Sequence, residues 1–174
     1  TVSADAGSCT ASNVSLGTPT TGDNCSVASV TNNAPTTFPL GNTTVTWTVT
    51  DGSGNTATAN QVITVEDKQN PTITAPAAKT VSADAGSCTA SNVSLGTPAT
   101  GDNCSVASVT NNAPATFPLG NTTVTWKVTD GSGNTATATQ VITVEDKQNP
   151  TITAPAAKTV SADAGSCTAS NVSL

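Results

Sequence analysis

Short stretches of alternating apolar and polar residues recur along the chain, and turn-forming residues separate them. The clearest stretch lies at residues 123–129, where Val124, Trp126 and Val128 alternate with Thr and Lys side chains. An alternation with a period of two is typical of a strand with one buried and one exposed face. No stretch has the 3.6-residue period of an amphipathic helix. The pattern therefore predicts an all-β protein.

Turn signals divide each unit of the chain into six or seven short predicted strands. Gly96, Thr97 and Pro98 predict a reversal of the chain, and the Gly-rich loop 130–134 predicts a hairpin. The predicted strands of one full unit lie at residues 71–76, 79–83, 88–95, 105–111, 115–119, 123–129 and 135–144. Many short strands with turn signals between them are typical of a β-sandwich.

The chain repeats itself at a fixed period. Residues 1–79 return at 80–158 with four changes, and a third copy begins at Thr159. The changes are Thr20 to Ala99, Thr36 to Ala115, Thr48 to Lys127 and Asn60 to Thr139. A fixed period indicates one structural unit used in series, here as a window of a longer array. The expected domains are a unit that lacks its first strand at 1–66, a complete unit at 67–146 and the start of a third at 147–174.

The composition excludes several classes of function. The net charge is −6 and the chain has no Arg and no His, so a polyanion such as DNA or RNA would be repelled. No stretch approaches 18 consecutive apolar residues, so no membrane span is expected. Each full unit has one Trp and one Phe, which predicts a thin core. We expect an exported protein whose targeting signals lie elsewhere.

Five cysteines lie at corresponding positions of the copies. Cys9 and Cys25 have the same spacing as Cys88 and Cys104, and Cys167 would find its partner beyond the sequence. Two cysteines per small unit, with no CxxC pair and no His, favour a disulfide over a zinc site. A chain reversal midway would bring both sulfurs together, so we predict Cys9–Cys25 and Cys88–Cys104 bonds, each worth about 3 kcal/mol. Free thiols are the alternative.

A series of short motifs runs through the full unit. They are Pro71-x-Ile73-x-x-Pro76, Gly86-x-Cys88-x-Ala90, Asp102-Asn103-Cys104, Val109-Thr110, Phe117 to Gly120, Thr122 to Thr125 and Val128 to Ala136. With these motifs the whole unit resembles the hyalin repeat (HYR) family of immunoglobulin-like extracellular modules. The resemblance implies tandem modules in large surface adhesins and filaments, as in Bacteroidota. It also implies one disulfide between the two cysteines of a unit and no catalytic residue.

No catalytic constellation is recognisable in the chain. There is no His, and no Ser stands beside a recognisable base. The acidic residues fall in predicted turns and linkers rather than on the concave face that glycoside cleavage needs. We therefore expect no enzymatic activity.

The junction between units is the candidate metal site, and Ca²⁺ is the only cofactor that the sequence suggests. The last strand of a sandwich ends at the pole that faces the next unit, so oxygen-bearing side chains can meet there. The predicted ligands are Asp5 and Asp23 at this pole, Glu66, Asp67 and Asn70 in the linker, and Asp130 and Asn134 in the hairpin loop of the next unit. Ca²⁺ takes six to eight oxygen ligands. The alternative is that these are ordinary solvated turn residues.

Serial copies of one unit favour a mechanical role, because reach grows with copy number. We expect a secreted, bacterial, extracellular or cell-surface stalk or filament, stiffened by the short linker 67–71 with its Pro71. Its partners would be neighbouring repeats, and surface glycans or proteins reached through regions outside the sequence. One alternative is a repeat that itself binds a glycan or partner. The other is a subunit that polymerises when the tail of one chain completes the sandwich of the next by strand addition.

Overall fold

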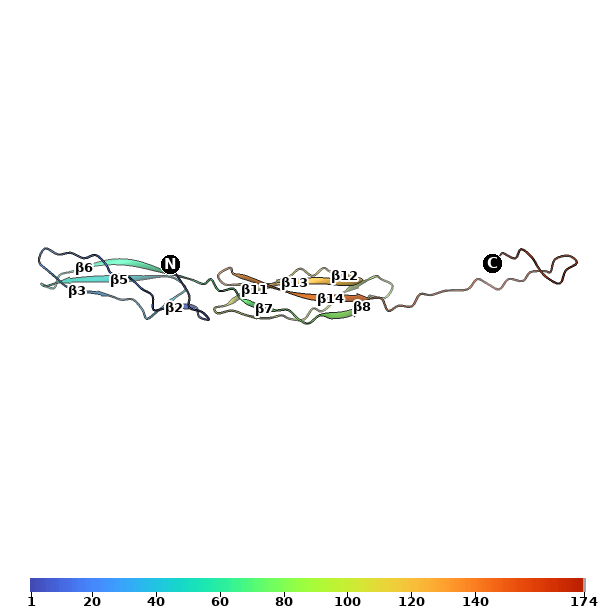
Figure 1. Ribbon diagram of the computed structural model, residues 1–174, viewed down its shortest axis with the longest axis horizontal. Helices are drawn as coiled ribbons and strands as arrows, with labels where there is room; N and C mark the ends of the chain where they lie inside the picture. Colours follow the sequence, from blue (N-terminus) through green and yellow to red (C-terminus); the bar gives the residue numbers. More distant parts are fainter. Residues whose placement is uncertain (174) are drawn as a thin grey trace.

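The computed structural model describes residues 1–173 as two β modules in a row, followed by an extended tail (Figure 1). Leu174, which ends the predicted third unit at 147–174, lies outside the described residues. All regular structure in residues 1–173 is β-strand, which confirms the predicted fold class. A helix long and apolar enough to cross a membrane is not found in this part of the chain.

The first module is built around a long hairpin. Its strands are β1 (Val2–Ser3), β2 (Thr10–Ser12), β3 (Val27–Asn32), β4 (Thr37–Pro39), β5 (Gly41–Asp51) and β6 (Thr56–Glu66). One sheet has the order β1-β6-β5-β3, with β1 parallel to β6, and β2 pairs with β4 in a second, small sheet. The hairpin loop between β5 and β6 lies at the opposite end of the module from the linker that follows β6 (Figure 1).

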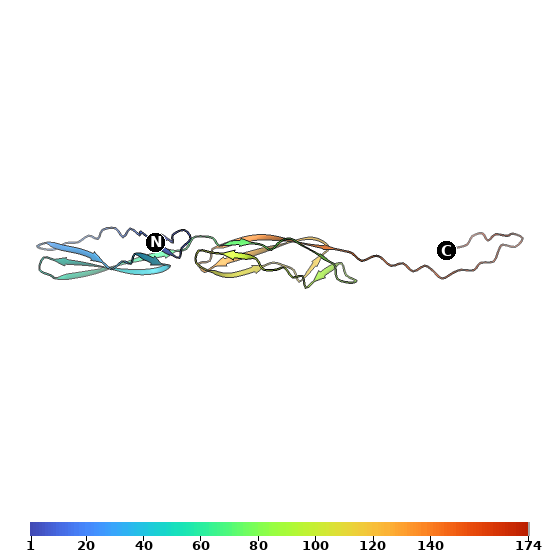
Figure 2. The same cartoon turned by 90° about the horizontal axis from the view of Figure 1, so that it is seen from below.

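The second module repeats this plan and adds two strands. It contains β7 (Thr72–Thr74), β8 (Lys79–Ser82), β9 (Thr89–Ser91), β10 (Ala99–Gly101), β11 (Val106–Asn111), β12 (Thr116–Pro118), β13 (Gly120–Asp130) and β14 (Thr135–Glu145). The large sheet has the order β11-β13-β14-β8, while β10 pairs with β7 and β12 with β9. The two modules lie end to end, and their long strands follow the long axis of the molecule (Figure 2).

The apolar face predicted from the alternation is the core of the second module. Val124 and Val128 are 0% exposed and Trp126 is 6% exposed, while Lys127 between them is exposed. Phe117 from β12 and Ile142 from β14 complete the core between the sheets. The predicted strand at 123–129 therefore has the predicted inward and outward faces.

The predicted reversal at Gly96 does not occur. β9 pairs with β12, whereas β10, at the other end of this segment, pairs with β7. Between them the chain runs lengthwise along the module, with Gly96 at a φ of 84° against Pro76. A residue with a side chain rarely adopts this φ, so Gly96 permits a local bend without turning the chain back. The consequence is that residues 88 and 104 lie at opposite ends of the module.

A buried glutamine ties the second module together. The Trp126 indole Nε1 donates to Gln140 Oε1 at 3.2 Å. The Gln140 Nε2 group donates to the carbonyl oxygens of Ala77 and Leu95, at 2.9 and 3.0 Å. Gln140 is only 2% exposed, so one side chain satisfies a buried indole and two backbone carbonyls on separate segments.

Acid should weaken the first module through Asp5. Its carboxylate accepts hydrogen bonds from the hydroxyl and the amide of Ser12, at 2.6 and 2.9 Å, and these bonds lower the pKa of Asp5. A lowered folded-state pKa means that the stabilisation is present above the ordinary value of about 4 and is lost as the pH falls through the folded-state pKa. Melting curves between about pH 6 and pH 2 measure this loss.

The variant Ser12→Ala should move this acid transition to higher pH, because the pKa of Asp5 then returns towards its ordinary value. Ser91→Ala is the matched control, because the Asp84 carboxylate accepts from the Ser91 backbone amide, which the substitution retains. An unchanged acid transition in Ser12→Ala would contradict the assignment to Asp5.

Candidate metal centre at the module junction

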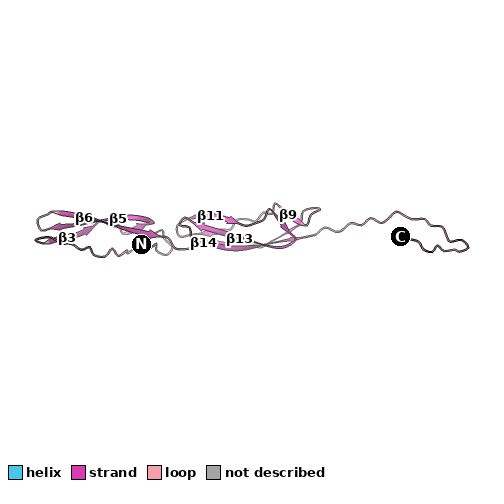
Figure 3. Cartoon of the chain, turned by 90° about the horizontal axis from the view of Figure 1, so that it is seen from above, coloured by secondary structure: helices cyan, strands magenta, loops and turns pink. Residues whose placement is uncertain are grey.

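The junction brings together four segments of the two modules (Figure 3). They are the turn before β2, the linker after β6, the loop 102–105 before β11 and the hairpin loop between β13 and β14. Two linker residues, Asp67 and Pro71, are buried. The linker is therefore packed between the modules at its two ends, while residues 68–70 between them are exposed.

A disulfide crosses the junction from Cys9 to Cys104, with their Cα atoms 5.1 Å apart. This bond corrects the predicted pairs Cys9–Cys25 and Cys88–Cys104, neither of which is formed. Cys25, Cys88 and Cys167 are exposed and free in the described residues. The physical reason is the missing reversal at residue 96, which leaves the two cysteines of one repeat too far apart for the geometry that a disulfide needs.

Hydrogen bonds from two asparagines of the second module fix it to the first. Asn103 Nδ2 donates to the carbonyl oxygen of Ser8 at 2.9 Å and to Asp67 Oδ1 at 3.3 Å. Asn134 Nδ2 donates to the Asp67 carbonyl oxygen at 3.2 Å. Asn134 is itself held by Asp130, whose Oδ2 lies 2.8 Å from Asn134 Nδ2. These contacts, with the disulfide, restrict how the modules can turn against each other.

Three buried oxygens at this junction have no hydrogen-bond partner. They are Asp67 Oδ2, Asp102 Oδ1 and Asn103 Oδ1. The other oxygen of each carboxylate is occupied: Asp67 Oδ1 accepts from the Gln69 amide at 3.0 Å, and Asp102 Oδ2 accepts from the Cys104 amide at 2.9 Å. Asp67 is only 7% exposed. Carboxylate oxygens of Asp67 and Asp102 and the Cys104 sulfur lie within 4.8 Å of one another.

This donor set suits a hard cation. Two neighbouring carboxylates with unpartnered, buried oxygens repel each other and are costly to bury without a counter-charge. Oxygen atoms of carboxylates and amides are the ligands that Ca²⁺ prefers. The Cys104 sulfur belongs to a disulfide and offers no thiolate to a softer metal. The site can therefore offer the carboxylate oxygens of Asp67 and Asp102, and the unpartnered Asn103 Oδ1 belongs to the residue next to Asp102, with water or backbone oxygens for the remaining positions.

Asp67, Asp130 and Asn134 belong to the hydrogen-bond network at the junction, and of these three predicted ligands Asp67 alone contributes an unpartnered oxygen. Asp130 and Asn134 come from the hairpin loop between β13 and β14, and Asn134 bonds to the Asp67 carbonyl oxygen. Asp130 uses both carboxylate oxygens within its own loop: Oδ1 accepts from the amides of Ser132 and Asn134, and Oδ2 from the Asn134 side chain.

The other four predicted ligands contribute none of the three unpartnered oxygens. Asp5 bonds within its own module. Asp23 lies at the far pole, beside the hairpin loop 51–55. Glu66 forms an exposed ion pair with Lys68, and Asn70 is exposed.

Asp102 and Asn103 are the site residues that the sequence reasoning missed. They occupy the same repeat positions as Asp23 and Asn24, one period later. The loop that contains them bonds to the hairpin loop of its own module, since the Gly131 amide donates to the Ser105 carbonyl oxygen at 3.0 Å. Because that hairpin loop was expected at the junction, the loop beside it could have been placed there too.

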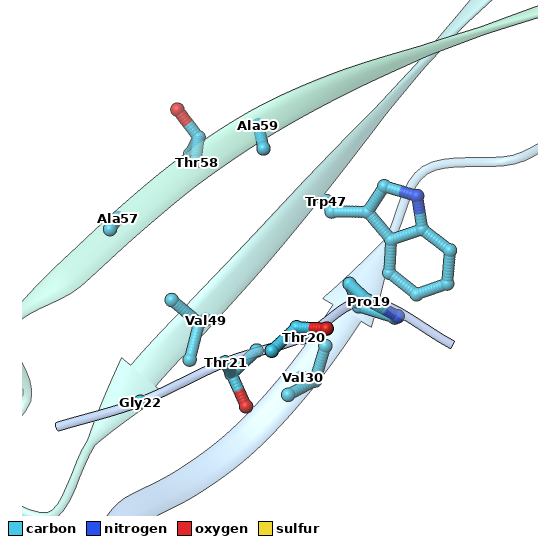
Figure 4. A pocket seen from close by; sticks show the side chains of 10 residues that line it. All are labelled: Pro19, Thr20, Thr21, Gly22, Val30, Trp47, Val49, Ala57, Thr58 and Ala59. Carbon is cyan, nitrogen blue, oxygen red and sulfur yellow. The ribbon is translucent and has the colours of Figure 1, made fainter. Parts of the chain in front are cut away.

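A pocket of about 250 Å³ opens on the first module beside Trp47 (Figure 4). Its lining includes Val30 and residues 20–22. In the second module the matching residues, 99–101, pair with β7, and Ile73 of β7 packs against the core. The pocket therefore marks the place that β7 fills in the other copy, and Trp47 is only half-buried as a result.

Comparison with known proteins gives one family and a weak structural likeness. The family model described as "HYR domain" matches residues 3–65 and 66–144. No curated protein matches the chain. Among solved structures, protocadherin gamma B7 extracellular cadherin domains 1-4 is 12% identical at a TM-score of 0.35, covering 70% of this chain and 42% of that one. Protocadherin gamma B2 domains 1-5 is 10% identical at 0.33, covering 73% and 32%. The chain thus spans less than half of these structures, and at these TM-scores the likeness supports no statement about function.

Proposed function

Because the chain belongs to the HYR domain family, whose model matches both modules, we propose that it is a structural repeat of an extracellular stalk or filament. HYR modules in tandem indicate an adhesion-type role outside the cell. In this role the repeats are non-enzymatic spacers that contact neighbouring repeats, and any glycan or protein partner is bound by regions outside this sequence.

The packed junction is the observation that supports a rod. Asn103 and Asn134 bond across the junction, Cys9 and Cys104 are covalently joined, and the linker residue Asp67 is buried between the modules. Domains linked without such contacts are expected to move independently. A rod holds its ends apart, which is what a stalk must do.

Small-angle X-ray scattering tests the rod. The oxidised chain should scatter as one stiff, elongated particle. The double variant Asn103→Ala with Cys104→Ser should broaden the distance distribution, because the junction loses its bond and its main side-chain contact. The matched variant Asn24→Ala with Cys25→Ser changes the same repeat positions at the far pole, where Cys25 is free and exposed, and should scatter like the parent chain. A parent chain with a distance distribution as broad as that of the junction variant would overturn the rod.

A test for binding separates the spacer from the alternative of a ligand-binding module. A spacer predicts that the chain, at micromolar concentration, binds none of the glycans on an array of bacterial and host oligosaccharides. Specific, saturable binding by this chain would favour the ligand-binding module instead.

Calcium at the junction is the further element of the proposal, and the three unpartnered oxygens of Asp67, Asp102 and Asn103 support it. A cation bound there would neutralise one carboxylate of the linker and one of the loop before β11, and so stiffen the rod. With free Ca²⁺ at one hundred times its dissociation constant, binding would stabilise the folded chain by about 2.7 kcal/mol.

Removing Ca²⁺ with a chelator should therefore lower the melting temperature of the chain. Asp102→Asn should abolish this difference, because it removes one charged ligand. Asp23→Asn, the matched change at the far pole, should leave it intact. Calorimetric titration with Ca²⁺ gives the stoichiometry, expected to be one ion per junction. A chelator effect that persists in Asp102→Asn would place the ion elsewhere, and no effect in the parent chain would reject the site.

Strand complementation is a second candidate function, favoured by the pocket at Trp47. The tail segment 150–155 has the same sequence as residues 71–76, and its Ile152 is 97% exposed. The tail of one chain could thus enter the pocket of another as an added strand. Sedimentation analysis should then show association that grows with concentration and is lost in Ile152→Asp but retained in Thr151→Asp. A monomer at all concentrations would exclude this mode of assembly.

A further inference from the structure

The two cysteines of one module lie at its opposite poles. Cys88 directly precedes β9, at the end of the second module from which the tail leaves (Figure 3), and its carbonyl oxygen accepts from the Leu119 amide at 3.2 Å. Cys104 follows β10 at the other end, where it is bonded to Cys9 of the first module. Cys9 and Cys88 occupy the same position in their repeats. Cys88 therefore lies at the end of the second module where a following module would join. Cys9 lies at the corresponding end of the first module, where the second module joins it.

We propose that the Cys9–Cys104 bond is one member of a ladder of disulfides that joins each module to the next. In the ladder, Cys88 bonds to the cysteine that matches Cys104 in the following copy, and Cys25 bonds to the cysteine that matches Cys9 in the preceding copy. Both thiols are exposed and free in the described residues, at the poles where such partners would meet them. The residues of the repeat that form the observed junction are unchanged between the copies, so the same contact can recur at every junction.

Each bond of the ladder forms by oxidation of two thiols. The two sulfurs lose two protons and two electrons and join, while a disulfide oxidant, such as oxidised glutathione or an oxidised dithiol protein, is reduced to two thiols by exchange. An oxidising space outside the cytoplasm supplies such oxidants.

The ladder would make a stalk almost inextensible, a consequence that rests on the proposed spacer function. Once the bonds are made, the shortest covalent path through a repeat is the segment from Cys88 to Cys104. Fully stretched, this segment reaches about 55 Å, against about 270 Å for a whole repeat. Strand β13 alone, with 11 residues, is about 37 Å long when folded. A module that unfolds under tension therefore adds little length while its bonds are intact.

Force spectroscopy on the chain tests whether the Cys9–Cys104 bond shortens the covalent path between the two ends. When the oxidised chain is pulled by its two ends, the force passes through the Cys9–Cys104 bond. The 95 residues that separate Cys9 from Cys104 are then not extended. Its fully extended length should be about 310–340 Å shorter than that of the reduced chain. Bonds within each repeat would shorten it by only about 110 Å, and free thiols would not shorten it at all. Either of these results would overturn the proposal.

A tryptic map reads the pairing directly, because the chain is cleaved after its lysines. Cys9 and Cys25 lie in peptide 1–68, and Cys88 and Cys104 lie in peptide 80–127. The unreduced chain should give these two peptides joined, whereas bonds within repeats leave them separate. Cys104→Ser should abolish the joined species, and Cys25→Ser, the matched change at the far pole, should retain it.

The ladder itself is tested by inserting a second copy of residues 80–158 after Lys158 and oxidising with glutathione disulfide. Two bonds in series should join peptide 1–68 to two copies of peptide 80–127 in one species. A map that shows only one joined pair, with Cys88 alkylated, would limit the bond to a single junction and overturn the ladder. The proposed rod is tested separately by scattering. If the extended chain is stiff but lacks the second bond, the spacer function stands and only the ladder is rejected.

Discussion

Phe117→Ala should lower the free energy of unfolding of the second module by about 3–5 kcal/mol. Phe117 is 2% exposed and packs in the cluster that contains Ala90, Val124 and Ile142. The change removes most of an aromatic side chain and leaves a cavity that the small strands β9 and β12 cannot close. A module of this size has only a few kcal/mol to lose, so we expect it to be largely unfolded at room temperature.

Urea unfolding followed by tryptophan fluorescence measures this loss, because each module has one tryptophan. In a Trp47→Phe background the signal reports on the second module alone. Phe38→Ala should have a similar effect on the first module, since Phe38 is also 2% exposed. Leu119→Ala is the control: Leu119 is 43% exposed, and its loss should change the free energy by no more than about 0.5 kcal/mol. Equal effects of Phe117→Ala and Leu119→Ala would contradict the assigned core.

Gln140→Leu should destabilise the second module by about 1–3 kcal/mol. Leucine has a similar volume, but it offers no partner to the Trp126 indole or to the carbonyl oxygens of Ala77 and Leu95. The buried Trp126 indole left without a partner costs about 1–3 kcal/mol, whereas the carbonyl oxygens of exposed Ala77 and half-buried Leu95 can be reached by water and cost less. The penalty should therefore exceed the gain from a more apolar side chain.

The first module supplies the matched comparison for this prediction. Gln61 accepts from Trp47 at 2.9 Å and donates to the Leu16 carbonyl oxygen at 3.1 Å, and it is only half-buried. Gln61→Leu should thus cost less than Gln140→Leu, by about the net contribution of one hydrogen bond, 0.5–1.5 kcal/mol. Melting curves of the two variants test the order. A larger loss of stability in Gln61→Leu would show that the hydrogen bond from Gln140 to Ala77 does not stabilise the second module.

The junction shows how neighbouring modules change residues of identical sequence. Cys9 is half-buried and bonded, whereas Cys88 at the same repeat position is exposed and free. Asp102 is half-buried at the junction, while Asp23 is exposed at the far pole. Local sequence is the same in each pair, so the difference comes from what the adjoining module places beside it.

The local pattern of the sequence was enough to predict seven of the eight strands of the second module and the two faces of β13, but it missed β10 (Ala99–Gly101) and extended β9 beyond Ser91. Alternation placed Val124, Trp126 and Val128 in the core and Lys127 outside, because a strand's side chains point to opposite faces whatever its partner. The return of residues 1–79 at 80–158 likewise fixed the tandem order of the modules, and the motifs of the unit identified the HYR family.

Only the tertiary structure decided which end of a module each loop reaches. The disulfide and the metal ligands depend on whether the chain turns back after β9 or continues to β10. That choice is made by the pairing of β10 with β7, a strand that precedes both β8 and β9 in the chain. A Gly-Thr-Pro turn signal is compatible with either path. Pairing between distant strands has no local signature, so Cys104, Asp102 and Asn103 could be brought to the junction only by the folded chain.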